Sequence, residues 1–540
     1  MAIHTRPDSP PSIKILFRGM KLGGFCCRWS TPKRVGVLML LLCTGSTVSA
    51  QMAPATLSEK SAMHQHYDAA YRFQSSGDLA RADVEHARFL VAALDHIANF
   101  HANTGDYAHA APLYDEALTL SPTDFSLLMD YAGASLDAHD PKKAESLLQA
   151  AGDLDTKSTT GRQKAEVHRV LGSAFRALGD SKAASEQFQA AIAIDPSIDN
   201  LCALGDAVLD TNGPKAAAPI FAKVVAQFGD TAGVRMRIGR IYGMGGVPDR
   251  AIEEFKKAIA MDPKMPGAHY SLGAAYMGNS EADFPKAEAE FRKELALHPN
   301  DTFSYPQLGQ IALRRHDYHE AEIDYKRAVA LNPLDGDNFD ELGKIYMETE
   351  RASDAEAALR KAIALTVDPA RNNYAIQRAH YRLGRLLLTN GNMAEGEHEL
   401  QISQELLAKR DIQSGSKLSG EQVERSPLER TRVATPAEVE ELETFAKQTG
   451  PLIAGSYNNL GVHAAIREEF AKAAGFFQLA AKWNPTLSGV DSNWGRAAFA
   501  AHQCERAIGP LRRALDAHPS DSELRAMLDQ CEGALSTMPK

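Results

Sequence analysis

The sequence is poor in aromatic residues and lacks the common catalytic motifs. Trp occurs 3 times in 540 residues, and Phe, Trp and Tyr together make up 7% of the chain. This composition favours closely packed helices over an enzyme built on a sheet. The chain contains neither a GxxxxGK[ST] phosphate loop nor a GxSxG nucleophile motif. A helical zinc-protease motif fails as well, because Ile402 stands where a second histidine would have to follow His398.

Three further groups could suggest a ligand site but do not have the pattern of one. A phosphate loop would follow a strand, whereas the glycines here fall in an expected turn between helices. Spacing by two scatters histidines around a helix, and the one tight histidine–carboxylate group falls at an exposed turn. We therefore expect no metal site and no cofactor. The groups are Gly243 with Gly245 and Gly246, His64 with His66 and Asp68, and His316 with His319 and Glu320.

Cysteine is too scarce for a disulfide framework. Three of the six cysteines lie within the first 50 residues, which leaves Cys202, Cys504 and Cys531 in the rest of the chain. Cys504 and Cys531 fall on neighbouring expected helices, where an oxidising compartment would let them pair. Two ordinary buried thiols are the alternative.

The charge balance argues against nucleic acid as a ligand. The formal net charge is -10, and residues 1–50 are basic, so the remainder is more acidic still. Such a chain repels a phosphate backbone unless a local basic stripe overrides the average.

Residues 1–50 are typical of a signal peptide. Lys33 and Arg34 precede an apolar run over 35–43, and Val48, Ser49 and Ala50 allow cleavage before residue 51. The run is short for a membrane span, so the chain would meet a membrane only through an uncleaved signal. We expect a periplasmic or secreted protein.

What the sequence has in abundance is self-similarity with a period of about 34 residues. A small residue recurs in one column: Ala98, Ala132, Gly172, Gly205, Gly239, Gly273, Gly309, Gly343, Gly384, Gly461 and Gly495. An alanine recurs in a second column: Ala110, Ala144, Ala184, Ala217, Ala251, Ala321, Ala355, Ala473 and Ala507. Large residues stand between these columns, and most units end at a proline.

These columns predict pairs of helices that pack closely. A small residue at the crossing point lets two helices approach, and the large residues fill the spaces beside it. Proline removes a backbone donor and ends the second helix. One hairpin cannot bury its apolar face, but stacked hairpins share a continuous core.

The columns resemble those of the tetratricopeptide repeat family. The likeness is close over Ile238–Pro263, "IGRIYGMGGVPDRAIEEFKKAIAMDP", and Leu460–Pro485, "LGVHAAIREEFAKAAGFFQLAAKWNP". The resemblance implies an all-α, right-handed solenoid of about twelve helical hairpins in two arrays. It is specific for the fold and says little about function.

The period also indicates how the chain is divided. We expect a signal peptide over 1–50, a first array over 57–410 and a second over 454–540 with a capping helix at its end. Residues 411–453 break the period with a polar connector, followed by an acidic helix that Thr435, Pro436 and Glu438 begin and Gly450 and Pro451 end. This helix could be a spacer, cover an array end or fill the groove of the array.

Binding of a protein or peptide partner is the function that this architecture supplies. In the family, positions near the small residue of each first helix face a bound peptide, so the resemblance implies a groove of adaptable apolar and cationic side chains. We expect an exported adaptor that is not an enzyme, acting in envelope assembly, secretion or polymer export. The alternative is a substrate-selecting regulatory subunit of an enzyme, or an enzyme built on the repeats. The implied groove residues are Met236, Arg240, Tyr270, Met277, Gln310, Lys344, Met347, Arg378, Tyr381 and Arg385.

Overall fold

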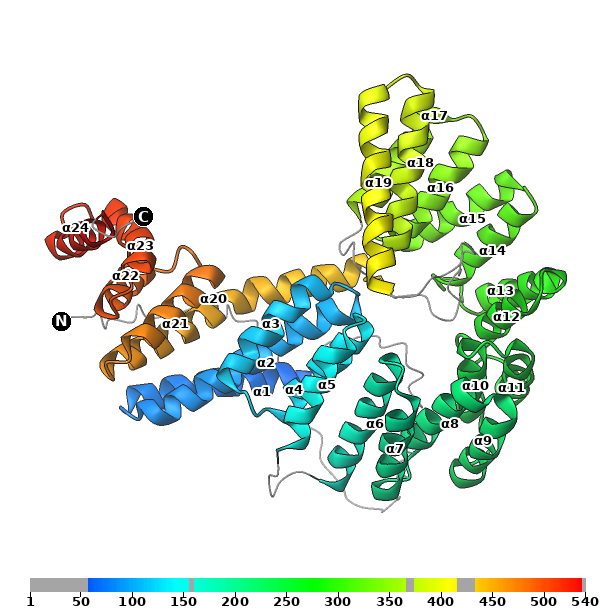
Figure 1. Ribbon diagram of the computed structural model, residues 1–540, viewed down its shortest axis with the longest axis horizontal. Coiled ribbons are helices and arrows are strands. Elements are labelled where there is room, and N and C mark those ends of the chain that lie inside the picture. The colour runs from blue at the N-terminus through cyan, green and yellow to red at the C-terminus, as the bar shows by residue number, and fades with distance from the viewer. Residues whose placement is uncertain (1–56, 155–159, 366–372, 415–432, 537–540) are drawn as a thin grey trace, which may run out of the picture. The chain divides into compact units, whose positions relative to one another are not determined.

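The computed structural model describes residues 57–154, 160–365, 373–414 and 433–536. Within these residues the chain forms 24 α-helices, one short 3-10 helix and no strand (Figure 1). The predicted all-α solenoid is therefore confirmed. The expected signal peptide over 1–50 lies outside the described residues, as does most of the polar connector.

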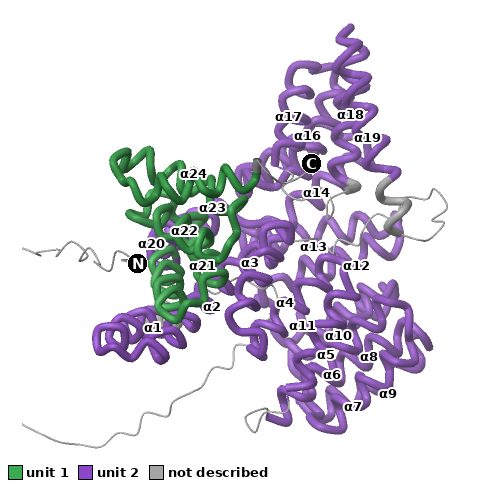
Figure 2. The backbone as a smooth tube through the Cα atoms, turned by 60° about the vertical axis from the view of Figure 1, so that its left-hand side comes forward, with its two compact units in different colours: residues 1–49, 454–540 green, residues 50–453 purple. Residues whose placement is uncertain are grey.

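The described chain falls into two compact units, one within residues 50–453 and the other within 454–540 (Figure 2). The first half of the larger unit holds α1 (Leu57–Ser75), α2 (Leu79–Asn103), α3 (Tyr107–Leu120), α4 (Phe125–Asp137), α5 (Pro141–Gly152), α6 (Gly161–Ala177), α7 (Ser181–Ile194), α8 (Ile198–Asn212), α9 (Pro214–Phe228) and α10 (Ala232–Met244). The second half continues with α11 (Pro248–Met261), α12 (Ala268–Asn279), η1 (Glu281–Asp283), α13 (Phe284–Leu297), α14 (Ser304–Arg314), α15 (Tyr318–Leu331), α16 (Gly336–Glu348), α17 (Ala352–Ala364), α18 (Asn373–Thr389) and α19 (Met393–Ser414). After α20 (Pro436–Ile466), the smaller unit contains α21 (Phe470–Trp483), α22 (Val490–Ala500), α23 (Cys504–Ala517) and α24 (Ser522–Ser536).

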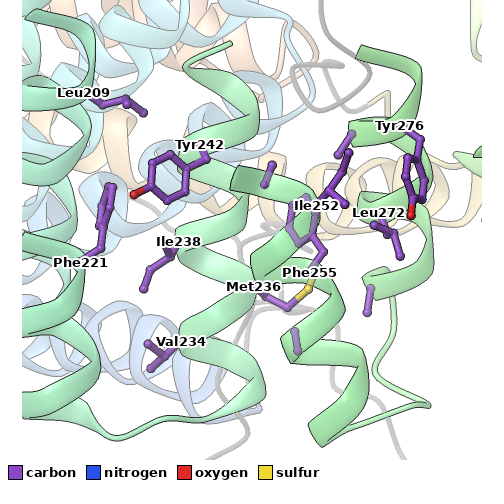
Figure 3. Packing of buried hydrophobic residues seen from close by; sticks show 14 of the residues in the cluster. Leu209, Phe221, Val234, Met236, Ile238, Tyr242, Ile252, Phe255, Leu272 and Tyr276 are labelled. Carbon is purple, nitrogen blue, oxygen red and sulfur yellow. The ribbon is translucent and has the colours of Figure 1, made fainter. Parts of the chain in front are cut away.

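Each helix from α1 to α18 packs against the next one along the chain. First helices of successive hairpins also touch one another, as α2 touches α4, α8 touches α10 and α16 touches α18. This double contact lets neighbouring hairpins bury one continuous core. Figure 3 shows that core around α9 to α12, where Phe221 and Tyr242 lie on one side of α10 and Phe255 on the other.

The small-residue column marks the closest approach within each hairpin. Each of six glycines lies under an aromatic ring of its partner helix, so that an added Cβ would meet the ring at 2.4 to 2.7 Å. Real Cβ atoms do not approach so closely, which is why the position requires glycine. The pairs are Gly172 with Phe188, Gly205 with Phe221, Gly239 with Phe255, Gly273 with Phe291, Gly309 with Tyr325, and Gly461 with Phe477.

The second column is equally well explained. Its alanines are at most 1% exposed, as a residue facing the partner helix must be when the helices lie close together. The members are Ala110, Ala144, Ala184, Ala217, Ala251, Ala321, Ala355, Ala473 and Ala507.

The turn inside many hairpins has one recurring design. A residue with positive φ precedes an aspartate that caps the following helix through its side chain, as Gly179 precedes Asp180. The aspartate oxygen accepts a hydrogen bond from the backbone N–H three residues later, and thus satisfies a donor that the helix start leaves unpaired. Asp78, Asp106, Asp140, Asp180 and Asp317 all cap in this way.

Helix α20 corrects the expectation that an acidic helix ends at Gly450 and Pro451. Its predicted start is confirmed, since the Thr435 N–H donates to Glu438 Oε2 at 2.9 Å and the Glu438 N–H donates to Thr435 Oγ1 at 3.4 Å. The helix then continues through Pro451 to Ile466. Proline in a helix interior costs about 3 kcal/mol, and burial of Phe445 before it and Ile453 after it offsets that cost.

The acidic part of α20 is more than a spacer within the larger unit. Phe445 is 6% exposed, and its ring centroid lies 4.4 Å from that of His96 on α2. This aromatic contact fixes the segment against one of the first helices of the array.

Candidate functional site

Some of the predicted groove residues are buried in the packing between helices, and others are exposed to solvent. Met236 is 3% exposed and packs in the core beside Phe255 (Figure 3). The prediction that it faces a partner is therefore wrong. Three residues before Gly239 is nearly one helical turn, so Met236 shares the face that packs on the neighbouring helix.

The α10–α12 part of the predicted groove is also largely occupied by packing. The Tyr270 ring centroid lies 5.8 Å from Phe291 and 5.7 Å from Phe303. Met277 is half-buried against the same core. Burial lowers the pKa of the Arg240 guanidinium, and Tyr270 is among its electrostatic neighbours. Gln310 on α14 is half-buried.

Helices α16 and α18 meet through a group of buried charges. Asp340 is 1% exposed, and its Oδ2 lies 2.7 Å from Arg378 Nε and 2.7 Å from Arg382 Nη1. Glu341 Oε1 lies 3.2 Å from Arg378 Nη2. Burial raises the pKa of Glu341, but Arg382 and Arg378 outweigh it, so this pKa lies below its ordinary value. Arg378 thus serves the helix contact, and the predicted role as a partner ligand does not fit its surroundings.

One turn beyond these charges lies the part of the predicted groove that faces solvent. Tyr381 is 46% exposed, and Arg385 Cζ lies 5.9 Å from its ring centroid. Lys344 follows Glu341 by three residues on α16, as Arg385 follows Arg382 on α18, so each cation lies on the same helix face as the buried group. Within the described ranges Lys344 and Arg385 form no ion pair. Met347 is half-buried and packs against the core cluster that includes Leu383 and Leu386.

We call Lys344, Tyr381 and Arg385 the α16–α18 surface. Arg385 beside the exposed Tyr381 ring, together with Lys344 on the neighbouring α16, can bind a carboxylate together with an apolar side chain or a peptide plane. The rigid pairing of α16 and α18 beneath them fixes their spacing.

Charge pairs between other first helices were not anticipated from the sequence. Arg176 on α6 pairs with Asp206 on α8, and Arg237 on α10 pairs with Asp199 on α8. The available signal was opposite charge at groove-facing positions of successive units. These pairs join neighbouring hairpins. The charges in them are neutralised within the chain and so are not available to a partner.

A second group of polar side chains lies between α2, α3 and α4. Tyr114 Oη donates to Asn99 Oδ1 at 2.8 Å, and Asn99 in turn bonds Asp95 and Asp130. Burial, followed by the charges of Asp130 and Asp124, raises the pKa of Asp95 to about 7. The carboxyl group therefore titrates near neutrality.

The turn between α2 and α3 brings two histidines onto one carboxylate. His101 Nδ1 lies 2.9 Å from Asp106 Oδ2, and His109 Nδ1 lies 2.7 Å from Asp106 Oδ1. Burial raises the pKa of Asp106, but hydrogen bonds from the two histidines outweigh it and hold the pKa below its ordinary value. Sequence reasoning missed this group; its signal is the spacing His-x4-Asp-x2-His across an expected inter-helix turn.

The histidine group that the sequence did single out is not assembled as a site. His316 Nδ1 lies 3.3 Å from Tyr318 Oη, and Glu320 accepts hydrogen bonds from Arg292 and Arg315. These contacts are those of a solvated turn.

A pocket of about 340 Å³ lies between α9, α10 and α11. Its lining includes the aromatic rings of Phe221 and Tyr242 and the charges of Arg235 and Glu254. Arg235 Nη1 lies 2.8 Å from Glu254 Oε2, so these charges satisfy each other.

In the smaller unit Cys504 and Cys531 are joined by a disulfide with a Cα–Cα distance of 4.9 Å. It links the start of α23 to α24, the last helix. Across the part of the chain that the structure describes, no helix combines the length and the apolar character that a membrane span requires.

Four family models match segments of the chain. The model described as TPR repeat matches 239–280, and models described as tetratricopeptide repeat match 104–165, 165–198, and 307–369 together with 341–401. No curated protein matches the chain.

Solved structures similar to the chain include MamA from Desulfovibrio magneticus RS-1, from residue 41 to its end. It is 24% identical with a TM-score of 0.30, and the alignment covers 34% of this chain and 98% of that one. A tetratricopeptide repeat protein from Parabacteroides merdae is 16% identical, with 50% and 93% covered and a TM-score of 0.31. A human IFIT1 dimer with PPP-AAAA is 15% identical, with 63% and 89% covered and a TM-score of 0.32. Together with the stacked hairpins and their glycine–ring contacts, the family matches identify the chain as a tetratricopeptide repeat protein.

Proposed function

We propose that the chain is an exported adaptor that binds a protein or peptide partner at the α16–α18 surface, formed by Lys344, Tyr381 and Arg385. The repeats make the chain a scaffold for protein–protein interaction. The observation that carries the choice of surface is the contrast between these side chains and the other predicted groove residues. Tyr381 is 46% exposed, whereas Met236 is 3% exposed and Arg378 is held by Asp340.

The chemistry of this surface favours a partner segment with a carboxylate beside an apolar or aromatic side chain. Arg385 and Lys344 supply positive charge, and Tyr381 supplies a flat apolar contact with a polar end. A nucleic acid is disfavoured because the chain carries a net charge of -10. The adaptor role would be played in envelope assembly, secretion or polymer export, without catalysis by the chain itself.

Export is supported by two independent features of the chain. Residues 1–50 have the basic, apolar and small-residue pattern of a signal peptide. Cys504 and Cys531 form a disulfide, and such bonds persist in oxidising compartments outside the cytoplasm.

Crosslinking in intact cells tests the surface. A photoreactive residue at position 381 should capture a partner that mass spectrometry identifies, and the triple variant Lys344→Glu, Tyr381→Ala, Arg385→Glu should lose it. The matched control is Arg327→Glu with Lys361→Glu, which reverses two exposed cations on the second helices α15 and α17. Loss of the partner in the control, or its retention in the triple variant, would reject this surface.

Fractionation tests the compartment separately. We expect the chain in the periplasm or medium, with an N-terminus near residue 51 and with Cys504 and Cys531 protected from alkylation until a reductant is added. A cytoplasmic chain in which both thiols react at once would contradict export and leave the surface assignment to be judged by crosslinking.

A further inference from the structure

The turn between α2 and α3 carries three metal-ligand side chains within reach of one ion. His101 stands in the last turn of α2, Asp106 caps α3, and His109 stands in its first turn. One ligand atom from each lies within 4.8 Å of the others. The rings of His101 and His109 lie 5.4 Å apart with an angle of 31° between their planes, so both Nδ1 atoms face the same carboxylate.

Capping of α3 does not require these histidines, because four other turns in the chain cap without them. In each of the five turns the aspartate N–H donates to the carbonyl five residues earlier, at 2.7 to 2.9 Å. Each aspartate side chain also accepts from the N–H three residues later. The backbone hydrogen bonds of the cap are thus the same in all five turns, whatever side chains stand five residues before and three residues after the aspartate.

The positions five residues before and three residues after the aspartate are both histidine only at Asp106, among these five turns. Around Asp180, for example, they are Phe175 and Ala183. The remaining turns have Phe73 with Arg81, Ser135 with Lys143, and Ala312 with Glu320. A histidine pair that the fold does not need, placed on a carboxylate that the fold does need, points to a ligand.

The exposure of the three side chains suits an ion that enters from solvent. The Asp106 side chain is 12% exposed and that of His101 is 23% exposed, whereas that of His109 is 65% exposed. The first two residues therefore form a fixed base, and the exposed His109 side chain is free to adjust to the ligand–metal distances of about 2.0–2.2 Å that such an ion requires. Two imidazoles and one carboxylate are a ligand set that Zn²⁺ accepts with a further position open.

We propose that His101, Asp106 and His109 bind one divalent transition-metal ion of the Zn²⁺ class. The ion would join the end of α2 to the start of α3, and its open position would take water or a side chain from a partner. This inference does not depend on the α16–α18 surface, which lies on other helices of the array.

Metal titration of the full chain, prepared without a histidine tag, tests the site. We expect calorimetry with Zn²⁺ to give one site per chain, and Co²⁺ in its place to give visible absorption bands of a site with nitrogen and oxygen ligands. The double variant H101F/H109A gives this turn the side chains found around Asp180, so it should fold as the parent does. It should show neither the Co²⁺ absorption bands nor the heat of Zn²⁺ binding. The single variant H109A should weaken binding about tenfold or more.

A matched control separates this site from general histidine binding. H64A/H398A removes two exposed histidines from α1 and α19 and should leave the Zn²⁺ affinity unchanged. Hydrogen exchange across residues 101–109 should slow when Zn²⁺ is added to the parent chain and stay unchanged in the double variant. A folded parent chain that binds no Zn²⁺, or a double variant that binds it with parental affinity, would overturn the proposal.

Discussion

The ring of Phe255 lies over the α-carbon of Gly239 so closely that a methyl group on that carbon would meet Cε1 at 2.6 Å. Gly239→Ala must therefore push the ring or separate α10 from α11. We expect a destabilisation of about 1–3 kcal/mol, the usual effect of overpacking a filled core. Because a long repeat array need not unfold in one step, hydrogen exchange of α10 and α11 peptides is the measurement of choice.

A control glycine makes this test specific. Gly133 lies inside α4, and a Cβ added there would meet nothing within 4 Å. Gly133→Ala should be neutral or stabilise by up to about 1 kcal/mol, because alanine restricts the unfolded chain. If Gly239→Ala and Gly133→Ala lost protection from hydrogen exchange equally, the contact with the ring would not be the reason that position 239 requires glycine.

This contact also explains why the fold was predictable from the sequence. A glycine and a large side chain sixteen residues later, as at Gly205 and Phe221, recur in most of the hairpins. The pattern is local and repeated, so each copy supports the reading of the others. Pro451 shows the limit of such local signals, since burial on both sides of it keeps α20 helical where proline alone predicts an end.

The candidate surface was less predictable, because exposure depends on contacts between units. Arg378 and Arg385 stand two turns apart on the same helix and have the same side-chain chemistry. Only the neighbouring α16, with Asp340 1% exposed, makes the first a packing residue and leaves the second at the surface. The histidines around Asp106 were missed for a related reason, since their sequence spacing gains meaning only once the turn brings them together.

Asp95 should make the stability of the α2–α4 region depend on pH. Burial and then the nearby charges of Asp130 and Asp124 raise its pKa to about 7, above the value of about 3.9 in an unfolded chain. The folded state therefore holds the proton more tightly, so its contribution to stability is complete below pH 4 and is lost as the pH rises to 7.

Asp95→Asn removes this titration. At pH 8 the variant should be more stable than the parent by up to about 4 kcal/mol, and near pH 4 the difference should vanish. Hydrogen exchange of α2 and α4 peptides at pH 8 and pH 4 measures the stability difference between the variant and the parent at each pH. Asp68→Asn on the exposed side of α1 is the control, and a pH dependence equal in both variants would place the titrating group elsewhere.

The disulfide should stabilise the last two helices. Cys504 and Cys531 are 27 residues apart in sequence, and closing a loop of that length in the unfolded chain contributes about 3.5 kcal/mol. Reduction should accelerate hydrogen exchange in α23 and α24. The variant Cys504→Ala/Cys531→Ala should exchange as fast as the reduced parent and show no response to reductant, whereas a response in the variant would trace the effect to another group.

Asp340 should be indispensable to the contact between α16 and α18. Its Oδ2 accepts a hydrogen bond from Arg378 Nε at 2.7 Å and forms an ion pair with Arg382 Nη1 at 2.7 Å, and its backbone carbonyl accepts a hydrogen bond from Arg382 at 3.2 Å. Asp340→Ala leaves two guanidiniums beside Glu341 alone, and breaking a buried pair in this way costs about 3–5 kcal/mol. Exchange in α18 peptides should rise sharply in this variant.

Removing the opposing charges as well separates pairing from packing. Asp340→Asn with Arg378→Gln keeps the shape of the Asp340 side chain and removes one buried charge of each sign, so it should recover part of the stability that Asp340→Ala loses. Partner capture at position 381 should follow the same order, because Arg385 and Tyr381 are positioned by the same helix. If capture survives in Asp340→Ala while α18 exchanges freely, the partner itself orders the helix, and the surface is formed on binding and not before it.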